Sequence, residues 1–111
     1  MAYMNQFSES NGTTVVTILA APAASTTRTV GAGYINIANL NNVSTVITMQ
    51  ANVGGTVTVL EPAITIPVND SWSNAKNVYC LDLHNQTLEI YLSEVATTEL
   101  DVAVMYRDEA Q

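Results

Sequence analysis

The side chains that could do chemistry are few in this sequence and widely spaced. Its 111 residues include a single His, a single Cys and three cations. A zinc site needs at least three converging ligands, and His84 has only Asp82 close to it, so we interpret His84 as a loop residue. Cys80 lies in the apolar run 78–81 with no neighbouring base to activate it. We therefore expect Cys80 to be a small, buried, unreactive side chain.

Carboxylates offer the other possible chemistry. Glu99 and Asp101 share one face of a predicted strand near the C-terminal end, and Glu89 lies in the strand before it. A carboxylate pair is the machinery of glycoside hydrolysis. The chain has only one Trp, one Phe and five Tyr with which to line a sugar-binding cleft. We interpret the acids as the exposed polar side of a sheet, and we predict no enzymatic activity, no cofactor and no metal.

Charge is scarce and unevenly placed. The net charge is −7, only 12% of residues are charged, and Arg28 is the sole charged residue between Ser10 and Leu60. Phosphate backbones repel such a chain, so direct nucleic-acid binding is not expected. The sequence begins with no secretion signal, and no apolar stretch reaches the length of a membrane span. We expect synthesis in a cytoplasm and no membrane partner.

Alternating apolar and polar residues predict the fold. Turn signals separate the alternating segments roughly every 8 to 12 residues, as in antiparallel sandwiches, and no segment has an apolar stripe of helical length. We predict a single all-β domain, an antiparallel β-sandwich of about eight strands, with jelly-roll and immunoglobulin-like topologies both open. Residues 1–12 are predicted to be an N-terminal arm and residues 13–111 the sandwich. The predicted strand segments are 13–19, 26–30, 34–38, 43–51, 56–60, 64–67, 78–81, 87–92 and 99–107.

The same alternation predicts which side chains face the core. Ile35 and Ile37 share one face of their strand, and Val43, Thr45, Ile47, Met49 and Ala51 share one face of the next. The inward residues of the last two strands are expected to be Leu88, Ile90 and Leu92, and Leu100, Val102, Val104 and Tyr106. In the strand 99–107 the outward row is Asp101, Ala103, Met105 and Arg107.

A neutral β-surface indicates a protein that works by contact. Burying hydroxyl, amide and methyl groups costs far less than burying charges. Sheet edges are normally guarded by Lys, Pro or inward charges, and this chain has one Lys and three Pro, so we expect self-association. The candidate interface residues are aromatic, with core packing favoured over an interface role for one of them, Trp72. They are Tyr3 and Phe7 in the arm, Tyr34 and Tyr91 on outward faces, and Trp72.

The order of segments from about residue 29 to residue 108 resembles small all-β virion accessory proteins of tailed bacteriophages. The segments that carry this resemblance are 34–39, 44–49, 64–72, 79–82, 87–91 and 100–104. The resemblance implies a capsid decoration (cement) protein, located on the virion, which stabilises the head shell by burying β-surface between major capsid subunits.

That role implies the major capsid protein or other virion proteins as partners, and a homo-oligomer, with a trimer favoured. The arm would reach a neighbouring subunit. Two alternatives stay open. One is a neck or tail component, in which acidic charge keeps passing DNA from sticking. The other is a carbohydrate-binding module that uses Tyr34, Tyr91 and Trp72.

Overall fold

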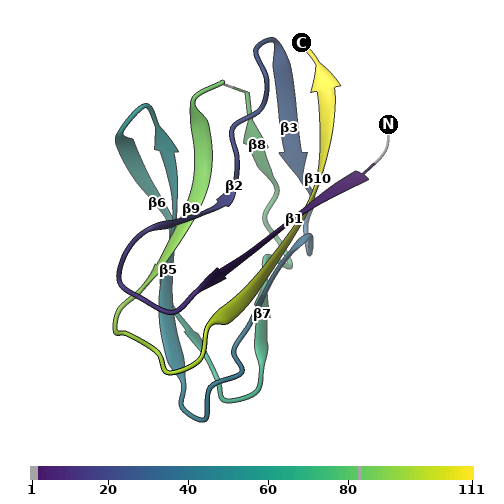
Figure 1. Ribbon diagram of the computed structural model, residues 1–111. Helices are drawn as coiled ribbons and strands as arrows, with labels where there is room; N and C mark the ends of the chain where they lie inside the picture. The colour runs from purple at the N-terminus through teal and green to yellow at the C-terminus, as the bar shows by residue number, and fades with distance from the viewer. Residues whose placement is uncertain (1–2, 83) are drawn as a thin grey trace.

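The computed structural model describes residues 3–82 and 84–111, which fold into ten β-strands and no helix (Figure 1). The predicted all-β class is confirmed. The strands are β1 (Tyr3–Ser10), β2 (Val16–Leu19), β3 (Thr26–Val30), β4 (Ile35–Ala38), β5 (Thr45–Val53), β6 (Thr56–Ile66), β7 (Ser71–Ser73), β8 (Tyr79–Leu81), β9 (Gln86–Leu92) and β10 (Leu100–Ala110).

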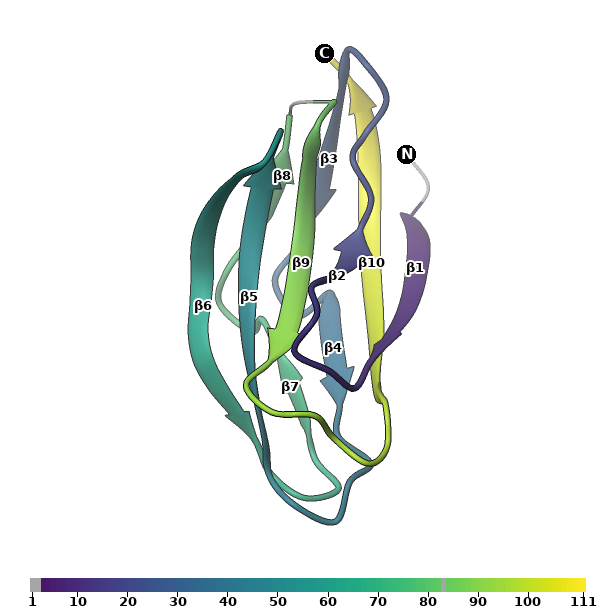
Figure 2. The same cartoon turned by 60° about the vertical axis from the view of Figure 1, so that its left-hand side comes forward.

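The strands form two antiparallel sheets. Sheet B has the order β2-β9-β5-β6. In sheet A, β10 pairs with β1 along one side and with β4 and then β3 along the other, so β3 and β4 lie end to end. β8 pairs with β3 and β7 pairs with β4, so β8 and β7 also lie end to end. If each end-to-end pair is counted as one interrupted strand, the sandwich has eight strands in a jelly-roll arrangement (Figure 2). Of the two topologies that the sequence left open, the structure therefore has the jelly roll.

Period-two alternation builds the core between the sheets. Side chains of successive strand residues point to opposite faces, so every second residue of a paired strand reaches the interior. Ile35 and Ile37 of β4 are fully buried, and the predicted rows of β5, β9 and residues 100–104 of β10 are at most 8% exposed. Val43 departs from the predicted row, because it precedes β5 and is 59% exposed. Tyr106 is half-buried against the core and beneath Arg28, whose guanidinium carbon lies 4.3 Å from the Tyr106 ring centroid.

The predicted N-terminal arm is instead a strand of the sandwich. Tyr3–Ser10 pairs with β10 without interruption, from Tyr3 opposite Arg107 to Ser10 opposite Leu100. The inward row of β1 includes Gln6 and Ser8, so the sequence has no apolar–polar alternation there. Residues 1–2 of the predicted arm lie outside the described residues.

The prediction of two separate strands, 56–60 and 64–67, on either side of Pro62 is also wrong. β6 runs from Thr56 to Ile66 as one strand, with register shifts against β5 near Glu61 and with Ala63 at a φ of 49°. Proline lacks a backbone N–H and is accepted on an edge strand, which is where β6 lies. The short strand β7 around Trp72 was not predicted either, because three residues carry too little periodicity.

Buried asparagines hold the loops 39–44 and 93–98, which lie at the lower end of the sandwich as drawn in Figure 1. The fully buried Asn39 donates Nδ2 to the carbonyls of Val43, Ile66 and Pro67, at 3.0 to 3.2 Å. Its Oδ1 accepts hydrogen bonds from the backbone N and the Nδ2 of Asn41, whose own Nδ2 donates to the carbonyl of Thr98. This network fixes the loop 39–44 against the loop 93–98.

Replacing Asn39 by Ala should destabilise the fold. The change strips partners from several buried carbonyls, and we expect a loss of about 3 kcal/mol in the free energy of unfolding, measured by urea titration. The exposed Asn42→Ala is the matched control and should stay within about 0.5 kcal/mol of the parent. Equal stability of the two variants would contradict the structural role of Asn39.

Candidate assembly surfaces

Three of the predicted interface residues share the outward face of sheet A. Tyr3 and Phe7 alternate along β1, and Tyr34 immediately precedes β4. The rings of Tyr3 and Tyr34 meet edge to face with centroids 5.4 Å apart, and the Tyr34 ring also packs over Gly31. The pKa of Tyr34 is raised because its hydroxyl hydrogen-bonds to that of Tyr3. Phe7 is 74% exposed.

The other two predicted interface residues lie elsewhere. Trp72 of β7 is opposite the fully buried Ile37 and packs against the core. Tyr91 alternates with the buried Ile90 and Leu92, so it lies on the outward face of sheet B. The aromatic set suggested for sugar binding is therefore spread over two opposite faces and the interior.

The predicted burial of Cys80 is wrong. Cys80 is exposed because β8 places it opposite Thr29 on the outward face of sheet A, while Leu81 takes the inward position. His84 lies exposed in the turn before β9. Within residues 3–82 and 84–111, no group of three or more His, Cys, Asp or Glu side chains is arranged to hold a metal ion.

Of the acids that suggested a carboxylate pair, Glu89 lies on a different sheet from Asp101. Asp101 is outward on sheet A, whereas Glu89 is outward on sheet B. Glu89 is nevertheless only 8% exposed, contrary to the prediction of an exposed acid. Gln50 donates Nε2 to its Oε1 at 2.9 Å, and the Nδ2 of Asn52 is 3.3 Å from each carboxylate oxygen. The amide partners of this carboxylate explain how it tolerates burial.

A second acidic group gathers where β1 and β10 begin to pair. Glu9 is directly opposite Asp101, and Glu99 lies just before β10. The pKa of Glu9 is raised by a hydrogen bond to Glu99 and by the charge of that carboxylate. Like charges opposite one another on a sheet destabilise it, so this corner carries negative charge that the monomer leaves uncompensated.

The sheet edges differ in how they are guarded. β7 and β8 have three residues each, and β2 has four with a register shift. β6 is long but irregular at Pro62, and its Glu61 accepts hydrogen bonds from Asn77 Nδ2 at 2.7 Å and the Tyr79 hydroxyl at 3.1 Å, which ties that edge to sheet A. β1 has eight residues, no Pro, no Lys or Arg, and no register shift. Only β1 therefore presents a long, regular and unguarded edge among the described strands.

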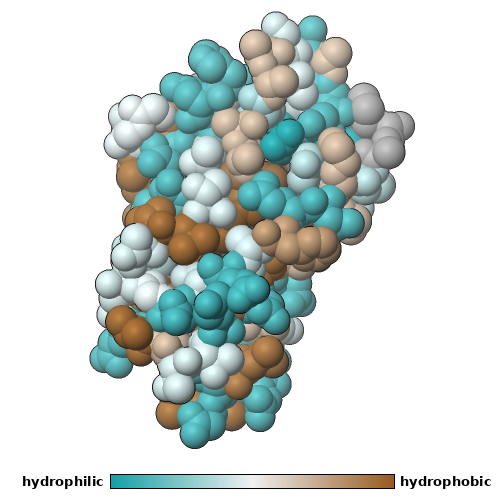
Figure 3. Space-filling model, viewed as in Figure 1, coloured by the Kyte–Doolittle hydropathy of each residue, from teal (hydrophilic) through white to brown (hydrophobic). Residues whose placement is uncertain are grey.

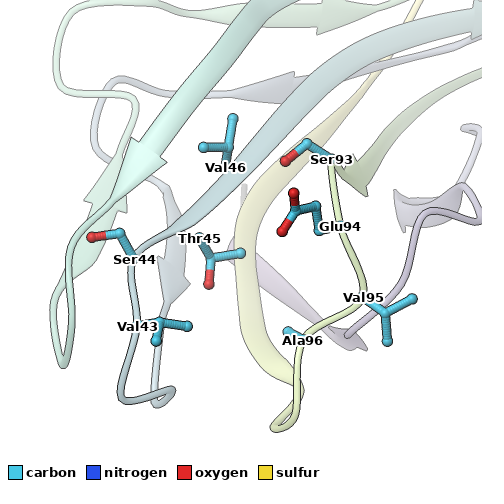
Figure 4. Close-up of a pocket in the computed structure, with 8 residues that line it drawn as sticks. All are labelled: Val43, Ser44, Thr45, Val46, Ser93, Glu94, Val95 and Ala96. Carbon is cyan, nitrogen blue, oxygen red and sulfur yellow. The ribbon is translucent and has the colours of Figure 1, made fainter.

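The lower end of the sandwich exposes aliphatic side chains on its loops. Leu40 is 56% exposed, Val43 59% and Val95 76%. Figure 3 shows apolar side chains at this end of the molecule. A cleft of about 210 Å³ opens between residues 43–46 and residues 93–96, where the two segments diverge below the hydrogen bond from Ser93 N to the carbonyl of Val46 (Figure 4).

Comparison with known proteins finds a likeness of fold. No protein-family model matches the chain, and no curated protein matches it. Among solved structures, a chain from the work described as "Bacillus endospore appendages form a novel family of disulfide-linked pili" is similar with a TM-score of 0.54 and 14% sequence identity. The likeness covers 98% of this chain and 85% of that chain. Within the described residues there is no helix of the length and apolarity needed to cross a membrane.

Removing the charge of Glu99 should lower the pKa of Glu9. A carboxyl with a raised pKa in the folded chain favours folding fully below its ordinary pKa, and that contribution disappears as the pH rises through the raised value. In Glu99→Gln we expect the Glu9 pKa to move back towards its ordinary value, measured by NMR titration of the carboxyl carbon. Glu109→Gln, at the far end of β10, is the control. A Glu9 pKa that is the same in both variants would refute the pairing with Glu99.

Proposed function

We propose that this protein is a structural subunit that docks on a larger protein assembly through the apolar loop end formed by Leu40, Val43 and Val95. The specific version that we favour is a capsid decoration protein bound to the outside of a bacteriophage head shell. Such a protein acts by binding to other protein surfaces and catalyses no reaction.

The observation that carries this proposal is the exposure of aliphatic side chains on loops that are already fixed. Val95 is 76% exposed, and Val43 lies across the cleft from it. The buried side chains of Asn39 and Asn41 hold both loops through hydrogen bonds to the carbonyls of Val43 and Thr98. Pre-ordered loops lose little conformational entropy on binding, so the burial of these apolar groups converts efficiently into affinity.

Charge indicates what kind of surface would receive the loop end. Glu94 lines the cleft, and Glu99 follows in the same loop. The chain as a whole carries a net charge of −7. A partner surface that is apolar at its centre and basic at its rim would complement this end, and a basic patch on a capsid subunit has that chemistry.

Fold-level analogy supports a structural role. Jelly rolls form viral capsid and lectin domains as well as cupins, so the fold by itself is compatible with several functions. The similar chain in the solved structure belongs to a pilus, which is also a structural assembly. Those pili are described as disulfide-linked. This sequence has one Cys, and one thiol cannot link a subunit to two neighbours, so a polymer of this chain would need non-covalent contacts for at least one of its two links.

A neck or tail position is the second candidate, favoured by the unbalanced acidic charge. A negative tube wall would repel DNA and let it pass. The sugar-binding alternative loses its support, because Tyr34, Tyr91 and Trp72 do not share a surface.

Copy number distinguishes the first two roles. Quantitative mass spectrometry of purified particles should find the protein in a fixed, high ratio to the major capsid protein if it decorates the shell. A ratio that corresponds to a single ring per particle would support the neck or tail position. Absence from particles would refute both.

Charged substitutions should test the docking surface. We expect Val95→Asp to weaken binding to isolated shells at least about tenfold, because a buried aliphatic contact of about 1.5 kcal/mol or more is lost. Val78→Asp is the matched control: Val78 is 58% exposed but lies beside β8, away from the loop end. Co-sedimentation with purified shells measures both. Equal loss in the two variants would argue against the loop end.

A further inference from the structure

The outward row of β1 and β10 changes character along its length. At one end Glu9 is opposite Asp101, in the middle Phe7 is opposite Ala103, and at the other end Tyr3 is opposite Arg107. The row is therefore acidic at one end, apolar in the middle and basic at the other. A surface with this order is complementary to its own image turned by 180°.

We propose that two copies of this chain pair through the free edges of their β1 strands, antiparallel and across a two-fold axis, to form one continuous sheet from both copies of sheet A. The inference goes beyond the proposed function and does not rest on it, since the loop end and β1 are different surfaces. A two-fold contact predicts a dimer in place of the trimer that the sequence favoured.

The edge of β1 suits this pairing because no second strand is paired with it among the described residues, although Ala20 N, just after β2, donates to Oε1 of Gln6 at 2.9 Å beside it. β1 pairs with β10 alone, so the backbone groups on its other side have no strand partner among the described residues. The other edges of the sandwich are short, shifted in register or interrupted by Pro62. Addition of a strand satisfies a row of N–H and C=O groups together.

Alternation restricts the register of the contact. A slip by one residue would put outward side chains beside inward ones. An axis at Gln6 avoids this, since it sets Phe7 opposite Asn5 of the second copy and Tyr3 opposite Glu9. The two Phe7 rings then lie diagonal to each other, at a separation that aromatic side chains can span. This arrangement gives the 74% exposed Phe7 a partner.

Charge complementarity identifies the second copy as the occupant. In this register Glu9 of one copy approaches Arg107 of the other, and symmetry repeats the pair. The Tyr3 ring meets Tyr34 edge to face, and the guanidinium carbon of Arg107 lies 6.0 Å from the Tyr3 ring centroid. Arg107 contacts Glu109 at 3.0 Å, and its side chain is 38% exposed. Arginine has five donors, so its exposed part can bind a second carboxylate.

The first test is the oligomeric state in solution. Analytical ultracentrifugation over a range of concentrations should show a monomer–dimer equilibrium whose dissociation constant rises with salt. Phe7→Ser should weaken the dimer by about a hundredfold, and Val95→Ser, with a similarly exposed side chain, should leave it unchanged. Thermal unfolding of both variants checks that each is folded.

Charge reversal gives a test that fold defects cannot mimic. Glu9→Lys and Arg107→Glu should each weaken the dimer about tenfold, and the double variant should recover most of the parent affinity. Failure of the double variant to recover would overturn the proposed pairing of Glu9 with Arg107.

Cross-linking tests the register. In a Cys80→Ser background, Gln6→Cys should form a disulfide-linked dimer under mild oxidation, because the axis brings the two substituted positions together. Thr58→Cys on the exposed edge β6 is the control and should form no disulfide-linked dimer. A monomer at all concentrations, a trimer, or a dimer indifferent to Phe7→Ser would each overturn the proposal.

Discussion

The pairing of β10 along both of its sides is the constraint on which sheet A depends. Its residues 101–104 pair with β1 on one side and with β4 on the other, and Arg107–Ala110 then pairs with β3. The inward row of the same strand, Leu100, Val102 and Val104, is fully or almost fully buried. One strand therefore sets the register of the sheet and also supplies part of the core. It also fixes which side chains reach the outer face beside β1.

The sequence predicted the strands whose two faces differ. Ile35 and Ile37, or Leu88 and Ile90, alternate with polar residues, and this pattern arises because one face of each strand is packed in the core. β1 escaped prediction because Gln6 and Ser8 line its inward side. Sheet order was not predictable, since pairing between distant strands leaves no local pattern. The topology determines which side chains share a surface. It places Tyr34 and Tyr91 on different sheets, exposes Cys80 on the outer face of sheet A, and puts amide side chains of neighbouring strands next to Glu89.

The aromatic residues and the aliphatic loop residues have different physical roles. Tyr3, Tyr34 and Phe7 were recognisable as candidates by type, and the structure brings the first two into contact. Leu40 and Val95 carried no signal, because an isolated aliphatic residue in a loop looks the same whether it folds inward or stays exposed. The alternation misplaced Val43 in a strand that begins only at Thr45. If both proposed contacts form, a single subunit has two kinds of neighbour. The loop end would meet a foreign surface, and β1 would meet an identical chain.

The joining of the first strand to the last affects how the protein is made. β1 is complete after Ser10 has been synthesised, but its partner residues 100–107 follow only after residues 11–99. Sheet A therefore cannot close until residues 100–107 have emerged from the ribosome, and both sides of β1 are unpaired until then. Distant pairings of this kind make folding slow. Nascent chains crowded on one messenger would be at risk of joining through unfinished sheets, which is a reason for such a protein to depend on dilution or chaperones during synthesis.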